Sequence, residues 1–83
     1  MRIDAFMNAT NIVKRRSIAQ DMIDNRVVKI DGVCVKASRN VKVGDVIEIA
    51  FFEKSQFFKV LKIPEIKNVP KSLSYEYVEK IVS

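Results

Sequence analysis

The stretch KRRSIAQDMI, residues 14–23, sets three consecutive cations directly before an amphipathic helical pattern. Its first part fits the capping box S-x-x-[EQ], with Ser17 as the N-cap and Gln20 folding back onto the cap. Four apolar residues recur at helical spacing behind the cap: Ile18, Ala19, Met22 and Ile23. The stretch therefore predicts a helix that begins at Ser17 and buries one face.

The three cations, Lys14, Arg15 and Arg16, stand at the unfavourable end of this helix. A helix N-terminus carries about half a positive charge, so each nearby cation costs roughly 0.3–1 kcal/mol. A phosphate bound there would satisfy free backbone N–H groups and relieve the repulsion at the same time. The alternative is a solvated run of charge whose repulsion is screened by salt. The pattern favours a phosphate site and leaves the alternative open.

The preceding segment predicts a first helix. Three apolar residues share one helical face: Ile3, Phe6 and Met7. Asp4 supplies negative charge near the start of this helix, and Thr10-Asn11 reads as its end. We expect the two helices to form an αα-hairpin that packs through its apolar faces.

A β section follows the helices. Apolar and polar residues alternate over 28–35 around the two-residue turn Asp31-Gly32, which is typical of a β-hairpin. A second turn over 42–45 leads into the alternating strand VIEIAFF, residues 46–52.

The remaining residues predict a hairpin and a tail. A polar loop, 53–56, should join the strand to its partner FFKVLKI, and Pro64 and Pro70 bracket an irregular connector. The tail SYEYVEKIV fits a short helix capped by Ser74, as a cover for the sheet or as a partner-binding element. Three tail residues would share one face: Tyr77, Val78 and Ile81. The predicted fold class is α+β: an αα-hairpin on a short, mostly antiparallel sheet, with a C-terminal β-hairpin and a short helical tail.

The charge of the chain is uneven. The net charge is +5, and residues 1–45 hold nine Lys/Arg against five Asp/Glu, whereas residues 46–83 hold six against five. A basic half joined to a nearly neutral half indicates a polyanion-binding face on a supporting scaffold, or else a solubilising surface.

The composition excludes most catalytic chemistry. The chain has no histidine, a single cysteine at Cys34 and two glycines outside any phosphate-loop motif, which excludes imidazole bases, the usual zinc sets and P-loops. We therefore expect no enzyme, no cofactor and no metal. No apolar run reaches the ~18 residues of a membrane span, and the N-terminus lacks the apolar core of a signal peptide. A cytoplasmic location follows as the expectation.

Four fragments in a fixed order carry a family resemblance. MRIDAF, KRRSIAQDMI, VKIDG and VKVGDVIEI resemble the S4-type RNA-binding domain, also called the αL motif. The resemblance covers about residues 1–50, and residues 51–83 would complete the same single domain with a hairpin and a tail. Arg26 stands where the family usually has glycine, so Asn25 is expected to supply the left-handed turn residue.

The resemblance implies an RNA-binding face on the helix pair and the adjoining β-turn. The residues carried over to that face are Arg2, Lys14, Arg15, Arg16, Ser17, Gln20, Lys29, Asp31 and Lys36. Arg16 is the first choice, because its planar guanidinium can bind a phosphate bidentately. Asp4 is expected to orient Arg2 or Arg16 rather than to contact RNA.

The aromatic residues indicate how RNA would be recognised. Alternation places Phe6, Phe51 and Phe58 in the core, and it favours core or partner contact over base stacking for Phe52 and Phe57. Recognition of structured RNA through phosphates and shape is therefore the expected mode.

Within the family, the chain resembles two stand-alone bacterial groups: heat-shock RNA-binding proteins of stalled large subunits, and RQC P-site tRNA-stabilising factors. Its compact length favours the second group. That resemblance implies binding to 23S rRNA and tRNA on the large ribosomal subunit, where P-site peptidyl-tRNA is stabilised while the nascent chain is extended. The alanine-tailing quality-control factor is a further candidate partner, and the free protein is expected to be monomeric. A general binder of structured RNA and a basic protein–protein adaptor remain the alternatives.

Overall fold

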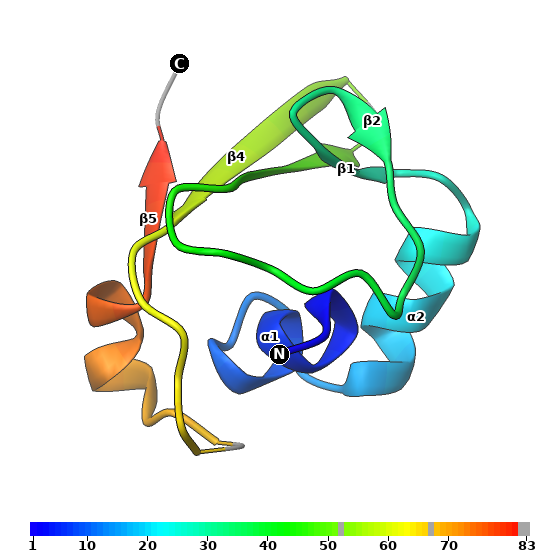
Figure 1. The fold of residues 1–83 in the computed structure, drawn as a ribbon. Helices are drawn as coiled ribbons and strands as arrows, with labels where there is room; N and C mark the ends of the chain where they lie inside the picture. Colours follow the sequence, from blue (N-terminus) through cyan, green and yellow to red (C-terminus); the bar gives the residue numbers. More distant parts are fainter. Residues whose placement is uncertain (52, 67, 82–83) are drawn as a thin grey trace.

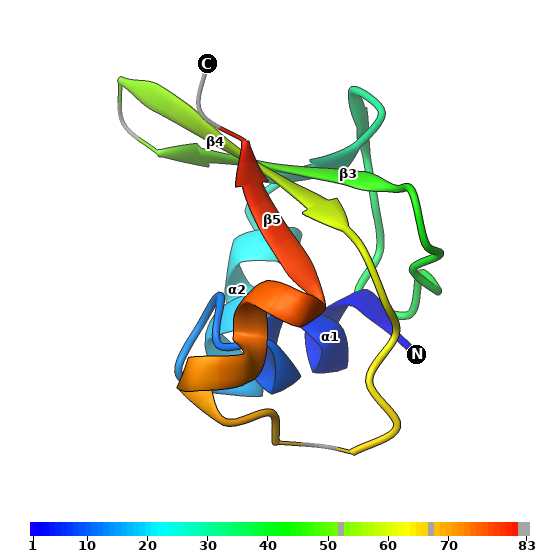
Figure 2. The ribbon, with the colours of Figure 1, turned by 90° about the vertical axis from the view of Figure 1, so that its left-hand side faces the viewer.

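The computed structural model describes residues 1–51, 53–66 and 68–81. In chain order the elements are α1 (Ile3–Ala9), α2 (Arg16–Asp24), β1 (Val28–Ile30), β2 (Val33–Cys34), β3 (Val46–Phe51), β4 (Lys54–Val60), the 3-10 helix η1 (Lys71–Glu76) and β5 (Val78–Ile81). The strands form one sheet in the order β2-β1-β3-β4-β5, and every neighbouring pair is antiparallel. Both α-helices lie on one face of this sheet (Figures 1 and 2). The predicted α+β class is confirmed.

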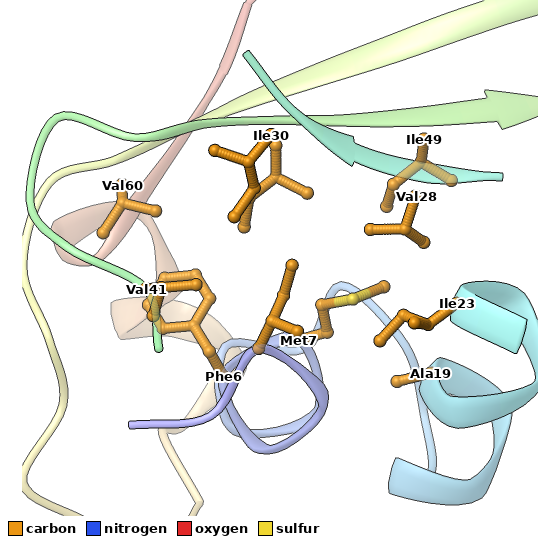
Figure 3. Packing of buried hydrophobic residues seen from close by; sticks show 11 residues of the cluster. Phe6, Met7, Ala19, Ile23, Val28, Ile30, Val41, Ile49 and Val60 are labelled. Atoms are coloured by element: carbon orange, nitrogen blue, oxygen red, sulfur yellow. The ribbon is translucent and has the colours of Figure 1, made fainter. Parts of the chain in front are cut away.

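The core lies between the helices and that face of the sheet. Ile3, Phe6 and Met7 of α1 are fully buried, as their shared helical face predicts. Their side chains meet those of the strands and of α2 (Figure 3). On α2, Ala19 and Ile23 are buried, whereas the predicted packing of Ile18 is wrong because its side chain is 40% exposed.

Alternation fixes the two faces of the sheet. Five buried strand residues point into the core: Val28, Ile30, Ile47, Ile49 and Val60. The predicted turn between β1 and β2 is confirmed, with Asp31 at φ 52° and Gly32 at φ 80°. Positive φ at both central residues is the type I′ geometry that matches strand twist.

Both α-helices end in the same way. In each, the N–H two residues past the C-cap donates to a carbonyl five residues back, Ile12 to Met7 (2.9 Å) and Val27 to Met22 (3.2 Å). The intervening left-handed residues are Asn11 at φ 64° and Arg26 at φ 60°. This is the Schellman motif. The expectation that Asn25 would take the left-handed conformation is wrong, because Asn25 has φ −82° and serves as the C-cap.

The β3–β4 hairpin has a shorter connection than the sequence predicts. Residues 54–56 belong to β4 rather than to a loop, and the register pairs Phe51 with Lys54. This end of the hairpin projects past the helices (Figure 2), so polar side chains are accommodated in a strand there. Phe52 lies outside the described residues, and the side chain of Phe51 is not described. Phe57 and Phe58 are half-buried.

The predicted tail helix is wrong. Residues 71–76 form η1, and β5 then pairs along the edge of β4 from Val78–Val60 to Ile81–Phe57. The open edge of β4 offers backbone partners, and a short helix is marginal by itself. Ser74 does not cap a helix; its hydroxyl lies 2.8 Å from the amide of Asn11. Within the described residues, no helix is long and apolar enough to cross a membrane.

Candidate nucleic-acid interface

A buried carboxylate organises the cationic end of the helix pair. Asp4 lies in the first turn of α1, and its side chain is fully buried. Its Oδ1 accepts the backbone N–H of Ala5 at 2.7 Å. Its Oδ2 accepts from three side chains: Arg2 Nη2 at 3.3 Å, Arg16 Nε at 3.1 Å and Gln20 Nε2 at 3.0 Å. One carboxylate therefore fixes two arginines whose side chains are about half exposed, at 47% and 46%.

The charge state of Asp4 follows from these contacts. Burial by itself would raise the pKa of Asp4, but hydrogen bonds from Gln20, Arg16 and the Ala5 amide, together with the charge of Arg16, lower the pKa below its ordinary value of 3.8. Asp4 is therefore ionised at neutral pH and forms charge-assisted bonds to both arginines. The expected role of Asp4 in orienting Arg2 or Arg16 stays a prediction; the structure places its carboxylate in contact with both arginines.

Asp4 also changes how α2 begins. The helix starts at Arg16 with Arg15 as its N-cap, and no side-chain capping bond is made at this end within the described residues. The predicted capping box is therefore wrong: Ser17 lies inside the first turn, and the amide of Gln20 donates to Asp4 instead. Because the Asp4 carboxylate pairs with Arg16 there, the protein itself offsets part of the repulsion between cations and helix dipole.

The arginine pair borders a hollow in the surface. The hollow encloses about 520 Å³ and is lined by Met1, Arg2, Ala5, Asn8, Arg16 and Asn68. Within the described residues, Arg16 donates to Asp4 through Nε alone, so both of its Nη groups are still available as hydrogen-bond donors. Two fixed guanidinium groups beside an open hollow form a suitable site for a phosphate oxyanion.

The other predicted residues divide into two sets. Lys14, Arg15 and Ser17 are exposed and adjoin Arg16 in the chain, so they extend this cationic end. The second set, Lys29, Asp31 and Lys36, lies away from this cationic end. Lys29 alternates with core residues of β1 and so points away from the helices, and Asp31 lies at the tip of the β1–β2 turn. Lys36 borders a different groove beside the end of α2.

Sequence reasoning missed several residues near these surfaces. The carbonyl of Arg39 accepts the N–H of Ile3 at 2.7 Å, which places an exposed arginine at the start of α1. Arg26 shares the groove of Lys36, and Asn8 and Asn68 line the hollow beside Arg16. The only sequence signal was their charge or polarity, because long-range backbone pairing such as the Arg2–Asn40 bridge brings Arg39 into place.

The chain matches known proteins over most of its length. The family model of the S4 domain matches residues 1–47. The chain is 40% identical over 78 residues to the RQC P-site tRNA stabilizing factor of Helicobacter pylori strain 26695, covering 94% of this chain and 93% of that protein. It is 32% identical over 71 residues to the factor of the same name from Bacillus subtilis strain 168, covering 86% and 79% of the two chains.

Two solved structures share the fold. The solution structure of the hypothetical protein HP1423 superposes with a TM-score of 0.85 at 37% identity, over 100% of this chain and 99% of that one. The trimeric structure of Vibrio cholerae Heat Shock Protein 15 superposes with a TM-score of 0.87 at 21% identity, over 98% and 81%. The second likeness concerns the fold alone.

Proposed function

Because the chain belongs to the S4 domain family, we propose that it is a non-catalytic RNA-binding protein that stabilises peptidyl-tRNA in the P site of the large ribosomal subunit during ribosome-associated quality control. Relatives that match over most of both chains carry the name RQC P-site tRNA stabilizing factor. The single observation that supports RNA binding most directly is the arginine pair fixed on buried Asp4.

Fixing the arginines before binding favours affinity. Ordering a long side chain at an interface costs about 0.5–1.5 kcal/mol, and the bonds to Asp4 remove part of that cost in advance. A guanidinium group also matches two phosphate oxygens at once, which an ammonium group does not. Arg2 and Arg16 are therefore proposed as the primary phosphate contacts, with Lys14, Arg15 and Ser17 as their neighbours.

The lining of the hollow favours recognition of shape over sequence. No aromatic side chain lines it among the described residues, so the hollow offers no ring for base stacking. Phosphate contacts by paired cations suit A-form RNA, because protein side chains cannot reach the bases through its narrow major groove. Structured RNA is the proposed ligand, with 23S rRNA and the P-site tRNA as the two elements contacted.

The proposed mechanism is a clamp. A rigid domain that contacts rRNA and tRNA together gains both sets of contacts only when the tRNA occupies the P site, so it shifts the tRNA toward that position by differential binding. No chemical step is required. A cytoplasmic location, a monomeric free state and cooperation with the alanine-tailing factor belong to the same proposal.

Co-sedimentation with ribosomal particles tests this function. Wild-type protein, Arg16→Ala and the control Lys80→Ala, which removes an exposed charge from β5, are centrifuged with large subunits that are vacant or carry peptidyl-tRNA. We expect wild type and the control to co-sediment selectively with the loaded subunits, and Arg16→Ala to remain at the top of the gradient.

Each other outcome contradicts part of the proposal. Equal binding to vacant and loaded subunits would remove the P-site role and leave a general RNA binder. Absence of wild-type binding at low salt would remove RNA binding altogether and favour the protein–protein adaptor.

A further inference from the structure

The C-terminal segment is fixed against the loop between α1 and α2. The amide Nδ2 of Asn11 donates to the carbonyl of Val69 at 2.7 Å and to Ser74 Oγ at 2.8 Å. The N–H of Val69 in turn donates to the carbonyl of Ala9 at 3.0 Å, and Val69 is only 3% exposed. Figure 2 shows η1 beside this loop. The start of η1 therefore has a defined place next to the cations that precede α2.

This docking creates a second hollow with two cations. It encloses about 310 Å³ and is lined by Asn11, Ile12, Val13, Lys14 and Lys71. Lys14 comes from the loop before α2, whereas Lys71 is the first residue of η1. Both side chains are exposed, and neither forms an ion pair within the part of the chain that the structure describes.

The charge of the residues that line this hollow favours binding of an anion. None of the five lining residues is acidic, so two like charges share one concave space without a counter-charge from the lining. An anion bound between them would replace their repulsion by two attractions and would be shielded from water on the concave side. Ammonium groups on flexible stems suit a phosphate as point charges, without requiring a fixed orientation.

We propose that this hollow binds a backbone phosphate of RNA, with Lys71 and Lys14 as its ligands. The inference rests on the proposed function and deepens it, because it adds a contact from outside residues 1–47, the part that matches the S4 domain. The RNA surface then extends from the Asp4-centred arginines across the loop before α2 onto η1. The C-terminal segment is part of the binding face and not only a cover for the sheet.

Asn11 acts as a positioning residue in this arrangement. Its backbone is left-handed, a conformation that asparagine tolerates better than most residues. Its side chain makes the only two side-chain bonds between this loop and residues 69–74 within the described chain. Loss of the Asn11 amide should therefore weaken the docking of η1, so that Lys71 is no longer held near Lys14, while both charges are retained.

Binding measurements with matched charge variants test the site. The probe is the large ribosomal subunit carrying peptidyl-tRNA, and the dissociation constant is measured at several salt concentrations. The variants Lys71→Gln and Lys71→Arg are compared with Lys80→Gln, which removes one exposed charge from β5. We expect Lys71→Gln to weaken binding about threefold to tenfold and to reduce the salt slope by roughly 0.7–0.9. Lys71→Arg should retain affinity, and Lys80→Gln should match wild type within about twofold.

Two further variants identify the shared site. If Lys14 and Lys71 bind one phosphate, the double variant Lys14→Gln/Lys71→Gln should weaken binding by a smaller factor than the two single-variant factors multiplied together. Asn11→Ala should weaken binding like Lys71→Gln, and Lys71→Gln should add little in that background. Thermal unfolding followed by circular dichroism shows which variants are folded, and Lys71→Gln is the decisive one because its side chain is exposed.

The outcomes separate this inference from the proposed function. If Arg16→Ala abolishes binding while Lys71→Gln and Lys80→Gln have equal dissociation constants, the second phosphate site is wrong and the proposed function stands. If Lys71→Gln weakens binding without a change in salt slope, no phosphate is bound there. If wild type does not bind the loaded subunit, the proposed function fails and the assignment of this hollow to RNA fails with it.

Discussion

Replacing Asp4 by asparagine should destabilise the protein strongly, although the two side chains have nearly the same shape. Asp4 is fully buried, and both of its carboxylate oxygens accept hydrogen bonds. An asparagine amide would have to point its NH₂ group either at the N–H of Ala5 or at the donors of Arg2, Arg16 and Gln20. Either orientation sets donor against donor in a buried place, which is costly.

The magnitude can be worked from the contacts. A hydrogen bond between charged groups contributes about 1.5–3 kcal/mol when it is shielded from water. Arg2 and Arg16 are 47% and 46% exposed, so screening reduces each ion pair to about 0.5–1 kcal/mol. With the bond from the uncharged Gln20 amide to this carboxylate at about 1 kcal/mol, Asp4→Asn should lower the free energy of unfolding by roughly 2–3 kcal/mol. For a domain of this size, that corresponds to a fall in Tm of about 10–20 °C.

The same contacts give a dependence on pH. The pKa of Asp4 is lowered in the folded protein, so the unfolded chain takes up this proton first as the pH falls. The stabilisation is therefore complete above the ordinary pKa near 3.8 and is lost as the pH falls through the lower folded pKa. Asp4→Asn removes this contribution, so the stability of the variant should decline less steeply with acid than that of wild type.

Urea unfolding at pH 7 and at intervals down to pH 3 measures both effects. Asp21→Asn is the control, because Asp21 is exposed on α2 and should change stability by less than about 0.5 kcal/mol. An Asp4→Asn protein as stable as the control at pH 7, with the acid dependence of wild type, would refute the role given to this carboxylate.

Three further predictions concern the turn, the tail and the RNA face. Arg26→Gly should raise the free energy of unfolding by about 0.5–1 kcal/mol in urea titrations, because φ 60° strains a side chain and suits glycine; a loss of stability would contradict the strain. Truncation before Val78 should cost more than about 2 kcal/mol, since β4 loses its edge partner and Val78 packs on the core; unchanged calorimetric melting would show that β5 serves only a partner. The logarithm of the affinity for loaded subunits should fall with the logarithm of salt at a slope of about −3 to −5 for four to six phosphate contacts, and a flat dependence in binding titrations would oppose the RNA assignment.

The sequence predicted those features that depend on neighbouring residues. Helical spacing identified Phe6 and Met7 as core residues, and Asp31-Gly32 identified the hairpin turn. The pairing of Asp4 with an arginine was also foreseeable, because an acceptor-only group facing a phosphate would repel it. In each case the controlling interaction lies within a few residues or within one repeating pattern.

The features that were missed depend on distant partners. Gln20 fits a capping box locally, but Asp4, sixteen positions earlier, provides a stronger acceptor. The tail has residues at helical spacing, but residues 78–81 form β5 instead because they pair with the free edge of β4. Lys71 had no local pattern at all, since Asn11 brings η1 beside Lys14 through hydrogen bonds that span 58 and 63 positions.

The bonds of Asn11 also set an order of events during synthesis. Their acceptors, Val69 and Ser74, leave the ribosome long after α1 and α2 have been made. The two hydrogen bonds from the Asn11 side chain therefore cannot form until residues 69 and 74 have emerged. An incomplete nascent chain carries the S4 motif and its arginines but lacks the η1 side of the face. Under the proposed function, only finished copies would therefore present both hollows to RNA.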